Sequence, residues 1–264
     1  EAHGWPLLAE PSSGARSGRC AVPAYRLLLD LPTLGGAVRR VVVLGRPTLT
    51  RPVQRLLARE DVEVHVLTPT GATWPDAARN ATTVTRAPLA STAGPPAPDE
   101  QWLHPWLAAG HAALDTALQV VRSTDRHLTG PAVADLVAHH PTPVLVVGSS
   151  HPVRDLDLVA DWAEAPHVLA NRGLAGIDGT VSTALGVALA TGAPTRALMG
   201  DLTFLHDVGG LLLGPDEPRP DLQLVVANDD GGSIFATLEH GDPARSAVFE
   251  RVFATPHRAD LAGL

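Results

Sequence analysis

The sequence has 264 residues, of which 45% are apolar and 18% charged, so it can bury a sizeable core in one large domain or two smaller ones. The formal net charge of -8 disfavours a surface that binds nucleic acid or an anionic membrane. No apolar run is long enough to span a bilayer, which excludes a transmembrane helix.

The kinds of basic residue and the number of cysteines exclude several types of site. All 20 basic residues are arginine, which excludes a lysine Schiff base and a P-loop lysine within this chain. Cys20 is the only cysteine, so the chain forms no internal disulfide and suits a reducing compartment. We therefore expect a cytoplasmic protein.

The first half of the chain predicts alternating strands and helices. Residues 41–44 form a continuous β-branched run, typical of a strand covered on both faces, and Pro52 suits the first turn of the helix that follows. Alternating valines predict a second strand at 62–71. The stretch 91–100 is rich in Pro, Gly and Ser, as in a linker, and 102–121 has the periodicity of a helix that leads into a second unit.

The second half continues this alternation. We expect a helix at 130–141, strands at 142–150, 195–201 and 221–229, a strand, Gly-rich loop and buried helix over 167–192, and a helix at the end of the chain. Repeated strand–helix alternation predicts an α/β fold in which parallel sheets are flanked by helices. We expect two domains, at 1–126 and 127–264.

Polar residues or glycines follow each strand of the second half, at 148–150, 171–173, 200–201 and 228–231. Ligands bind at the carboxyl ends of the strands in an open parallel sheet. Asp201 and Asp229 are hard oxygen ligands, and a carbonyl of the Gly231–Gly232 bend could be a third, a set that suits Mg²⁺ with phosphate oxygens. Gly200 and the bend would let the backbone approach a diphosphate, toward which the helix after Asp201 would point its N–H groups. Alternatively, both aspartates serve only as cap and turn residues.

These residues resemble a known family. Gly200-Asp201 followed by Asn228-Asp229 resembles the diphosphate-and-metal motif of thiamine-diphosphate enzymes, Gly-Asp-Gly followed after a spacer by Asn-Asn. Leu202 stands in place of the third-position glycine, and Asp229 in place of the second asparagine. Together with "NRGLAGIDG", "GDLTFLHD" and "NDDGGSIF", these departures resemble one branch, the 2-succinyl-5-enolpyruvyl-6-hydroxy-3-cyclohexene-1-carboxylate (SEPHCHC) synthases of menaquinone biosynthesis. The likeness is strong over 144–258 and weaker over 1–126.

The resemblance assigns a role to each predicted domain. It implies that 1–126 is the central, transhydrogenase-III-like domain without its first strand, with a linker helix, and that 127–264 is the diphosphate- and Mg²⁺-binding domain without its C-terminal part. In the family an activating glutamate comes from a pyrimidine-binding domain, usually across a subunit interface, and no segment here resembles that domain. We therefore expect a homo-oligomer, a dimer or tetramer, and a chain that is inactive alone.

The resemblance also implies which residues bind the cofactor and the metal. The side chains of Asp201 and Asp229 and the carbonyl of Gly231 would hold Mg²⁺ or Mn²⁺. Thiamine diphosphate would contact Gly200, Leu202, Thr203, Ser149, Ile177 and Asn228. Asn228 is also the alternative metal ligand if the register is shifted by one residue. Ile177 would lie under the bend of the cofactor, although an ordinary core isoleucine is an equal alternative.

The implied substrates, 2-oxoglutarate and isochorismate, are anionic. Arg154 and Arg172 would bind their carboxylates with help from Ser150, and we count both arginines with Ile177 as catalytic. Ile234 and Phe235 would form an apolar wall beside the substrate. The alternatives are surface ion pairs for the arginines and plain helix packing for the wall.

The implied reaction is that of a transferase. It decarboxylates 2-oxoglutarate and adds the resulting succinyl-semialdehyde carbanion to isochorismate. Two other functions stay open: another thiamine-diphosphate synthase or lyase related to acetolactate synthase, and a Rossmann-type oxidoreductase, for which Gly173, Gly176 and Gly179 have the wrong spacing. Arg46 and Arg51 could also serve a regulatory module, although solvated arginines are the simpler interpretation.

Overall fold

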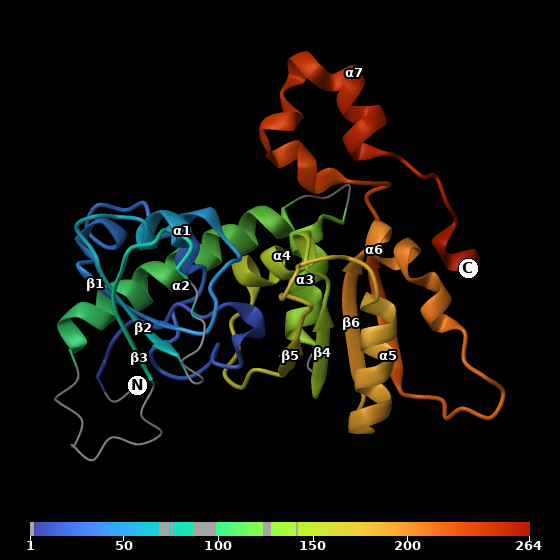
Figure 1. Cartoon of the computed structure of the whole chain (residues 1–264), viewed down its shortest axis with the longest axis horizontal. Coiled ribbons are helices and arrows are strands. Elements are labelled where there is room, and N and C mark those ends of the chain that lie inside the picture. Colours follow the sequence, from blue (N-terminus) through green and yellow to red (C-terminus); the bar gives the residue numbers. More distant parts are fainter. Residues whose placement is uncertain (1–2, 69–73, 75, 87–98, 124–127, 141) are drawn as a thin grey trace. The chain divides into compact units, whose positions relative to one another are not determined.

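The computed structural model describes residues 3–68, 74, 76–86, 99–123, 128–140 and 142–264 (Figure 1). The chain forms two compact units, one made of 1–123 with 157–165 and the other of 124–156 with 166–264. The predicted linker at 91–100 lies almost entirely outside the described residues, as does the end of the strand predicted at 62–71.

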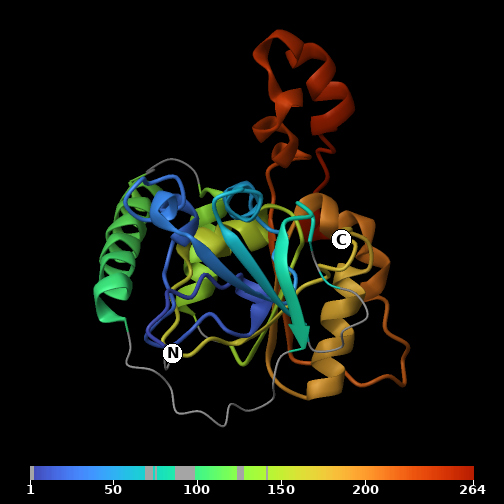
Figure 2. The same cartoon turned by 60° about the vertical axis from the view of Figure 1, so that its left-hand side comes forward.

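The first unit contains a parallel three-stranded sheet of order β1-β2-β3, which Figure 2 shows side by side. Its elements are β1 (Arg40–Leu44), α1 (Arg51–Leu57), β2 (Glu63–Thr68), β3 (Ala81–Arg86) and α2 (Glu100–Arg122), with short 3₁₀ turns at Pro11–Ser13, Tyr25–Leu27 and Gly35–Ala37. In β2 the alternation seen in the sequence is real, since Val64 and Val66 are buried in the core with Trp106 of α2. Asp99 caps α2 by accepting a hydrogen bond from the N–H of Trp102.

Two features of this sheet differ from expectation. The run 41–44 is not covered on both faces in the described structure, because only Val43 is buried while Leu44 is exposed. The strand β3 was not expected, since its residues are exposed or half-buried and lack an apolar alternation.

The second unit contains a parallel four-stranded sheet of order β5-β4-β6-β7. Its elements are α3 (Gly130–His139), β4 (Val144–Val147), α4 (His151–Val159, whose last residues belong to the first unit), β5 (His167–Leu169), α5 (Thr180–Thr191), β6 (Thr195–Gly200), α6 (Asp201–His206) and β7 (Leu222–Ala227). β4 is buried throughout, and α5 packs on β4, β6 and β7. The chain runs from β4 to β5 on one side and then crosses to β6 on the other, which creates a switch point at the carboxyl ends of β4 and β6.

After β7 the chain leaves the sheet and forms short helical turns before it returns (Figure 1, orange to red). These turns are Ser233–Thr237, Glu239–Gly241, Pro243–Arg245, α7 (Ser246–Phe249), a π-helical turn at Glu250–Ala254 and Leu261–Gly263; another 3₁₀ turn, Val208–Leu211, precedes β7. The prediction of a helix at the end of the chain is therefore wrong, because the structure has the 3₁₀ turn Leu261–Gly263 there.

The predicted α/β class is confirmed, because both sheets are parallel and helices flank them. The strands and helices predicted in the second half are present with shifted ends, while α4 was not expected. Among the helices that the structure describes, none combines the length and the apolar character that a bilayer crossing requires.

Candidate functional site

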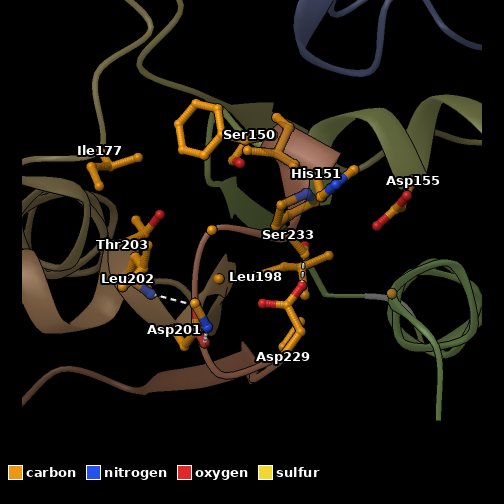
Figure 3. A pocket seen from close by; sticks show the side chains of 18 of the residues that line it. Ser150, His151, Asp155, Ile177, Leu198, Asp201, Leu202, Thr203, Asp229 and Ser233 are labelled. Atoms are coloured by element: carbon orange, nitrogen blue, oxygen red, sulfur yellow. Dashed lines mark hydrogen bonds between the residues drawn. The ribbon is translucent and has the colours of Figure 1, made fainter. Parts of the chain in front are cut away.

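A cavity of about 370 Å³ lies at the carboxyl ends of β4, β6 and β7 (Figure 3). This volume is within the range of small-ligand sites. Eleven of the residues predicted from the sequence line it: Ser150, Ile177, Gly200, Asp201, Leu202, Thr203, Asp229, Gly231, Gly232, Ile234 and Phe235. The structure thus brings together residues from four loops that the sequence separates.

Asp201 directly follows β6, as the first residue of α6, and is only 2% exposed. Its Oδ1 accepts a hydrogen bond from the N–H of Leu202 at 2.6 Å. Its Oδ2 accepts from the N–H of Gly231 at 2.8 Å, so the carboxylate joins the ends of β6 and β7. The Leu202 N–H at the start of α6 therefore binds Asp201 itself, and is not free for an anion as the sequence had suggested.

Asp229 follows β7 and faces the same cavity (Figure 3). Its Oδ2 accepts a hydrogen bond from the hydroxyl of Ser233. Asn228, the alternative ligand, is not among the lining residues, and its Oδ1 accepts from the N–H of Asp230 at 3.0 Å. This geometry favours Asp229 over Asn228 for contact with a ligand in the cavity.

The glycines of the site differ in what surrounds them. A Cβ atom on Gly200 would meet nothing within 4 Å, so the backbone there is open to a ligand. A Cβ atom on Gly231 would lie 2.1 Å from the carbonyl oxygen of Ala254, and one on Gly232 would lie 2.4 Å from that of Phe253. Gly231 and Gly232 thus allow close approach of the returning chain, whereas Gly200 leaves space beside the cavity.

Arg154 and Arg172 are not among the lining residues. The Nη1 atom of Arg154 donates to the carbonyl of Ser150 at 2.8 Å and to that of Ser149 at 3.4 Å. The Nη1 atom of Arg172 donates to the carbonyl of Ser149 at 3.4 Å. Both guanidinium groups therefore converge on the residues that follow β4, next to the lining residue Ser150.

Ser149 is buried and also lies outside the lining set. Its hydroxyl donates to the carbonyl of Asn171 at 2.8 Å, which ties the end of β4 to the loop after β5. Ile177 lines the cavity from that same loop, and its carbonyl accepts from the Thr180 hydroxyl at 2.9 Å, at the start of α5. Hydrogen bonds at both ends thus hold the loop that carries Ile177.

Two histidines at the site were missed from the sequence. His151 lines the cavity at the start of α4. Burial lowers the pKa of its imidazole, the nearby charge of Arg154 acts in the same direction, and the charge of Asp229 partly opposes both. His257 lies outside the lining set, and its Nε2 is 3.0 Å from Oδ2 of Asp201. His151 directly follows the predicted strand end at 148–150, which was a usable signal, whereas His257 became a site residue only through a contact between distant loops.

The donor set is suited to a divalent cation. Among the described residues no three His, Cys, Asp or Glu side chains form a metal-holding group by themselves. Asp201 and Asp229 are two hard carboxylates at one cavity, beside an open backbone at Gly200. Mg²⁺ is usually held by one or two carboxylates together with phosphate oxygens, so these residues fit a metal–diphosphate group.

The chain is similar along its whole length to several known proteins that share one name. The chain is 53% identical over 273 residues to the SEPHCHC synthase of Kineococcus radiotolerans, covering 100% of this chain and 48% of that protein. It is 51% identical over 276 residues to the SEPHCHC synthase of a Nocardioides species, covering 100% of this chain and 51% of that protein. The chain belongs to the SEPHCHC synthase family.

A third member, the SEPHCHC synthase of Renibacterium salmoninarum, is 49% identical over 271 residues, covering 99% of this chain and 47% of that protein. The chain spans about half the length of the SEPHCHC synthases that it matches. No family model matches the sequence.

Proposed function

We propose that the chain forms the diphosphate- and metal-binding part of a thiamine-diphosphate-dependent SEPHCHC synthase, together with its central domain. The observation that carries this proposal is that Asp201 and Asp229, which follow the neighbouring strands β6 and β7, line one cavity. In this assignment, 1–126 is the central, transhydrogenase-III-like domain, and 127–264 is the diphosphate- and Mg²⁺-binding domain.

The proposed metal is Mg²⁺, or Mn²⁺ in its place, held by the carboxylates of Asp201 and Asp229 and the carbonyl of Gly231. The two carboxylates would offset the charge of the ion, which would leave coordination positions for diphosphate oxygens. The open backbone at Gly200 lets the diphosphate lie close to the end of β6. Leu202 and Thr203 line the same side of the cavity and contact the cofactor.

When bound, thiamine diphosphate supplies an electron sink for the pair of electrons that remains after CO₂ leaves. Ile177, in the loop before α5, would pack against the cofactor from one side of the cavity. Ile234 and Phe235 line the cavity with apolar surface and exclude water from the reacting carbon. These residues orient and shield the reactants and transfer no proton themselves.

Arg154 and Arg172 bind the substrate carboxylates in this proposal, with Ser150 beside them. In the structure, their Nη1 atoms donate hydrogen bonds to backbone carbonyls next to the cavity. A substrate carboxylate would be a stronger acceptor than these carbonyls, because it carries a full negative charge and can accept two parallel hydrogen bonds from one guanidinium. Guanidinium groups also match the planar geometry of carboxylates.

The proposed reaction of the whole enzyme belongs to menaquinone biosynthesis. 2-Oxoglutarate loses CO₂, and the remaining succinyl-semialdehyde unit is added to isochorismate to give 2-succinyl-5-enolpyruvyl-6-hydroxy-3-cyclohexene-1-carboxylate. We further propose a homo-oligomer, a dimer or tetramer, in which the pyrimidine-binding domain of a neighbouring subunit completes the site with an activating glutamate.

The metal site can be tested by binding alone. Calorimetry should detect thiamine diphosphate binding to the chain that depends on Mg²⁺. Asp201→Asn and Asp229→Asn should each abolish the Mg²⁺ dependence, because the charge of the ion is then less well compensated. Unchanged affinity in both variants would overturn the assignment.

A further inference from the structure

The chain returns to the proposed metal site after its helical excursion. The return segment, residues 254–261, is attached to the loop after β7 at two points. The N–H of Gly232 donates to the carbonyl of Ala254 at 2.7 Å, and the N–H of Arg258 donates to Oδ1 of Asp230 at 2.7 Å. At its far end Leu261 packs on the core that contains Met199 and Phe204. The segment is therefore fixed at both ends.

His257 lies between these anchors and turns its ring toward Asp201. Its side chain is 13% exposed, and its Nε2 lies 3.0 Å from Oδ2 of Asp201. Its Nδ1 accepts a hydrogen bond from the N–H of Ala259 at 3.0 Å. Because a backbone N–H can only donate, Nδ1 carries no proton, so the proton of the ring is on Nε2 and is donated to Asp201.

The hydrogen bonds of Asp201 distinguish its two oxygens. Oδ2 accepts from two donors, the N–H of Gly231 and Nε2 of His257. Among the described residues, Oδ1 accepts a hydrogen bond from the N–H of Leu202 alone. A carboxylate oxygen has about two acceptor positions. The hydrogen bonds therefore leave Oδ1 as the oxygen with room for a cation.

We propose that His257 is a positioning residue that fixes the carboxylate of Asp201 so that Oδ1 is presented to the divalent ion. This inference rests on the proposed function, in which Asp201 is a metal ligand. His257 does not bind the ion itself, because its Nε2 proton is donated to Asp201 and its Nδ1 is occupied by the N–H of Ala259. Hydrogen-bonded partners behind a metal ligand commonly orient it in this way.

Two substitutions separate the hydrogen bond that His257 donates to Asp201 from the hydrogen bond that it accepts from the N–H of Ala259. His257→Gln keeps an N–H donor at the distance of Nε2 and so retains the bond to Asp201. His257→Asn places an acceptor near the position of Nδ1, which retains the bond to Ala259, but is too short to reach Asp201. His206→Asn is a matched control, because Nδ1 of His206 binds the exposed Asp178 at 2.9 Å and the residue does not line the cavity.

The readout is Mn²⁺ binding to the 264-residue chain with thiamine diphosphate, measured by the electron paramagnetic resonance signal of free Mn²⁺. We expect His257→Asn to weaken Mn²⁺ binding about 10- to 100-fold, the usual effect of losing such a partner. His257→Gln and His206→Asn should bind Mn²⁺ like the parent chain. The melting temperatures without metal and cofactor should be similar for all four proteins, since a purely structural role would change these instead.

Several results would overturn the inference. If both His257 variants bind Mn²⁺ like the parent while Asp201→Asn does not bind, the metal site stands and the positioning role fails. If His257→Gln folds but loses affinity, the donated hydrogen bond is not the cause, and this result overturns the inference even where His257→Asn does not fold. If the parent chain does not bind Mn²⁺, the proposed function fails and the inference fails with it.

Discussion

The guanidinium of Arg16 lies 3.0 Å from the carboxylate of Asp157, and both side chains are buried. The same guanidinium also donates to the carbonyls of Ala9, Asp157 and Ala160. These contacts attach 157–165 to the first unit, although the chain reaches that segment from the second. Arg26 lies at 3.9 Å as a second, more distant cation.

Loss of Arg16 should therefore be costly. Arg16→Met leaves the buried Asp157 without its nearest cation, and we expect the free energy of unfolding to fall by about 3–5 kcal/mol. Urea denaturation measures this change. The control is Arg55→Met, which removes an exposed ion pair with Asp30 and should cost about 0–1 kcal/mol. Equal losses in both variants would contradict a structural role for the buried pair.

The ion pair between Asp61 and Arg59 should make the stability of the fold depend on pH. Hydrogen bonds from Arg59, at 2.9 Å and 2.7 Å, hold the pKa of this carboxyl below its ordinary value. The pair therefore stabilises the fold above the ordinary aspartate pKa, and this stabilisation is lost as pH falls through the lowered value. Arg59→Gln should raise the pKa of Asp61 in an NMR titration, whereas Arg55→Gln should leave it unchanged.

Much of the second sheet could be predicted because burial leaves a strong mark on the sequence. β4 and β6 are apolar runs that end in small or acidic residues, and the ends of parallel strands meet at one edge. That rule alone predicted that Asp201 and Asp229 would lie near each other, as they do at the cavity.

The features that could not be predicted depend on contacts between distant residues or on weak local patterns. His257 meets Asp201 across 56 residues, and Arg16 meets Asp157 across 141. No periodicity marks such pairs. The helix α4 was not expected, because its short sequence "HPVRDLDLV" mixes charged and apolar residues. Arg154 and Arg172 follow two predicted strands, but the sequence pattern does not give the direction in which their side chains point.

Substitution by alanine should affect stability and cofactor binding differently at Gly200 and at Gly231. Gly200→Ala meets no atom within 4 Å, so the free energy of unfolding should change by less than about 0.5 kcal/mol, while the added methyl group should weaken diphosphate binding. Gly231→Ala should destabilise the fold by about 1–3 kcal/mol, because φ is +141° there and the new Cβ would meet the carbonyl of Ala254. Urea denaturation and calorimetry with thiamine diphosphate and Mg²⁺ measure the two effects, and normal cofactor affinity in Gly200→Ala would show that the diphosphate lies elsewhere.

Substitution of either arginine near Ser150 should weaken substrate binding more than cofactor binding. Arg154→Ala and Arg172→Ala should leave the affinity for thiamine diphosphate with Mg²⁺ nearly intact. Each should weaken 2-oxoglutarate binding to the cofactor-loaded chain by about 1.5–3 kcal/mol, as expected for a lost charged hydrogen bond. Arg196→Ala is a control, because its guanidinium binds Gln223 and the carbonyl of His140. A variant of Arg154 or Arg172 that loses the cofactor and keeps substrate binding would move that arginine to the diphosphate site.

The last prediction concerns turnover by the chain itself. Activation of thiamine diphosphate in this family is expected to need a glutamate, and none of the residues that line the cavity is a glutamate. Glu239 and Glu250 lie in the helical turns after β7 and are also absent from the lining. The 264-residue chain with thiamine diphosphate and Mg²⁺ should therefore bind the cofactor but release no CO₂ from 2-oxoglutarate, as a coupled CO₂ assay would measure. Addition in trans of the pyrimidine-binding domain from a SEPHCHC synthase should restore CO₂ release, and Asp201→Asn should abolish the restored activity. CO₂ release by the chain alone would show that it supplies its own activating group.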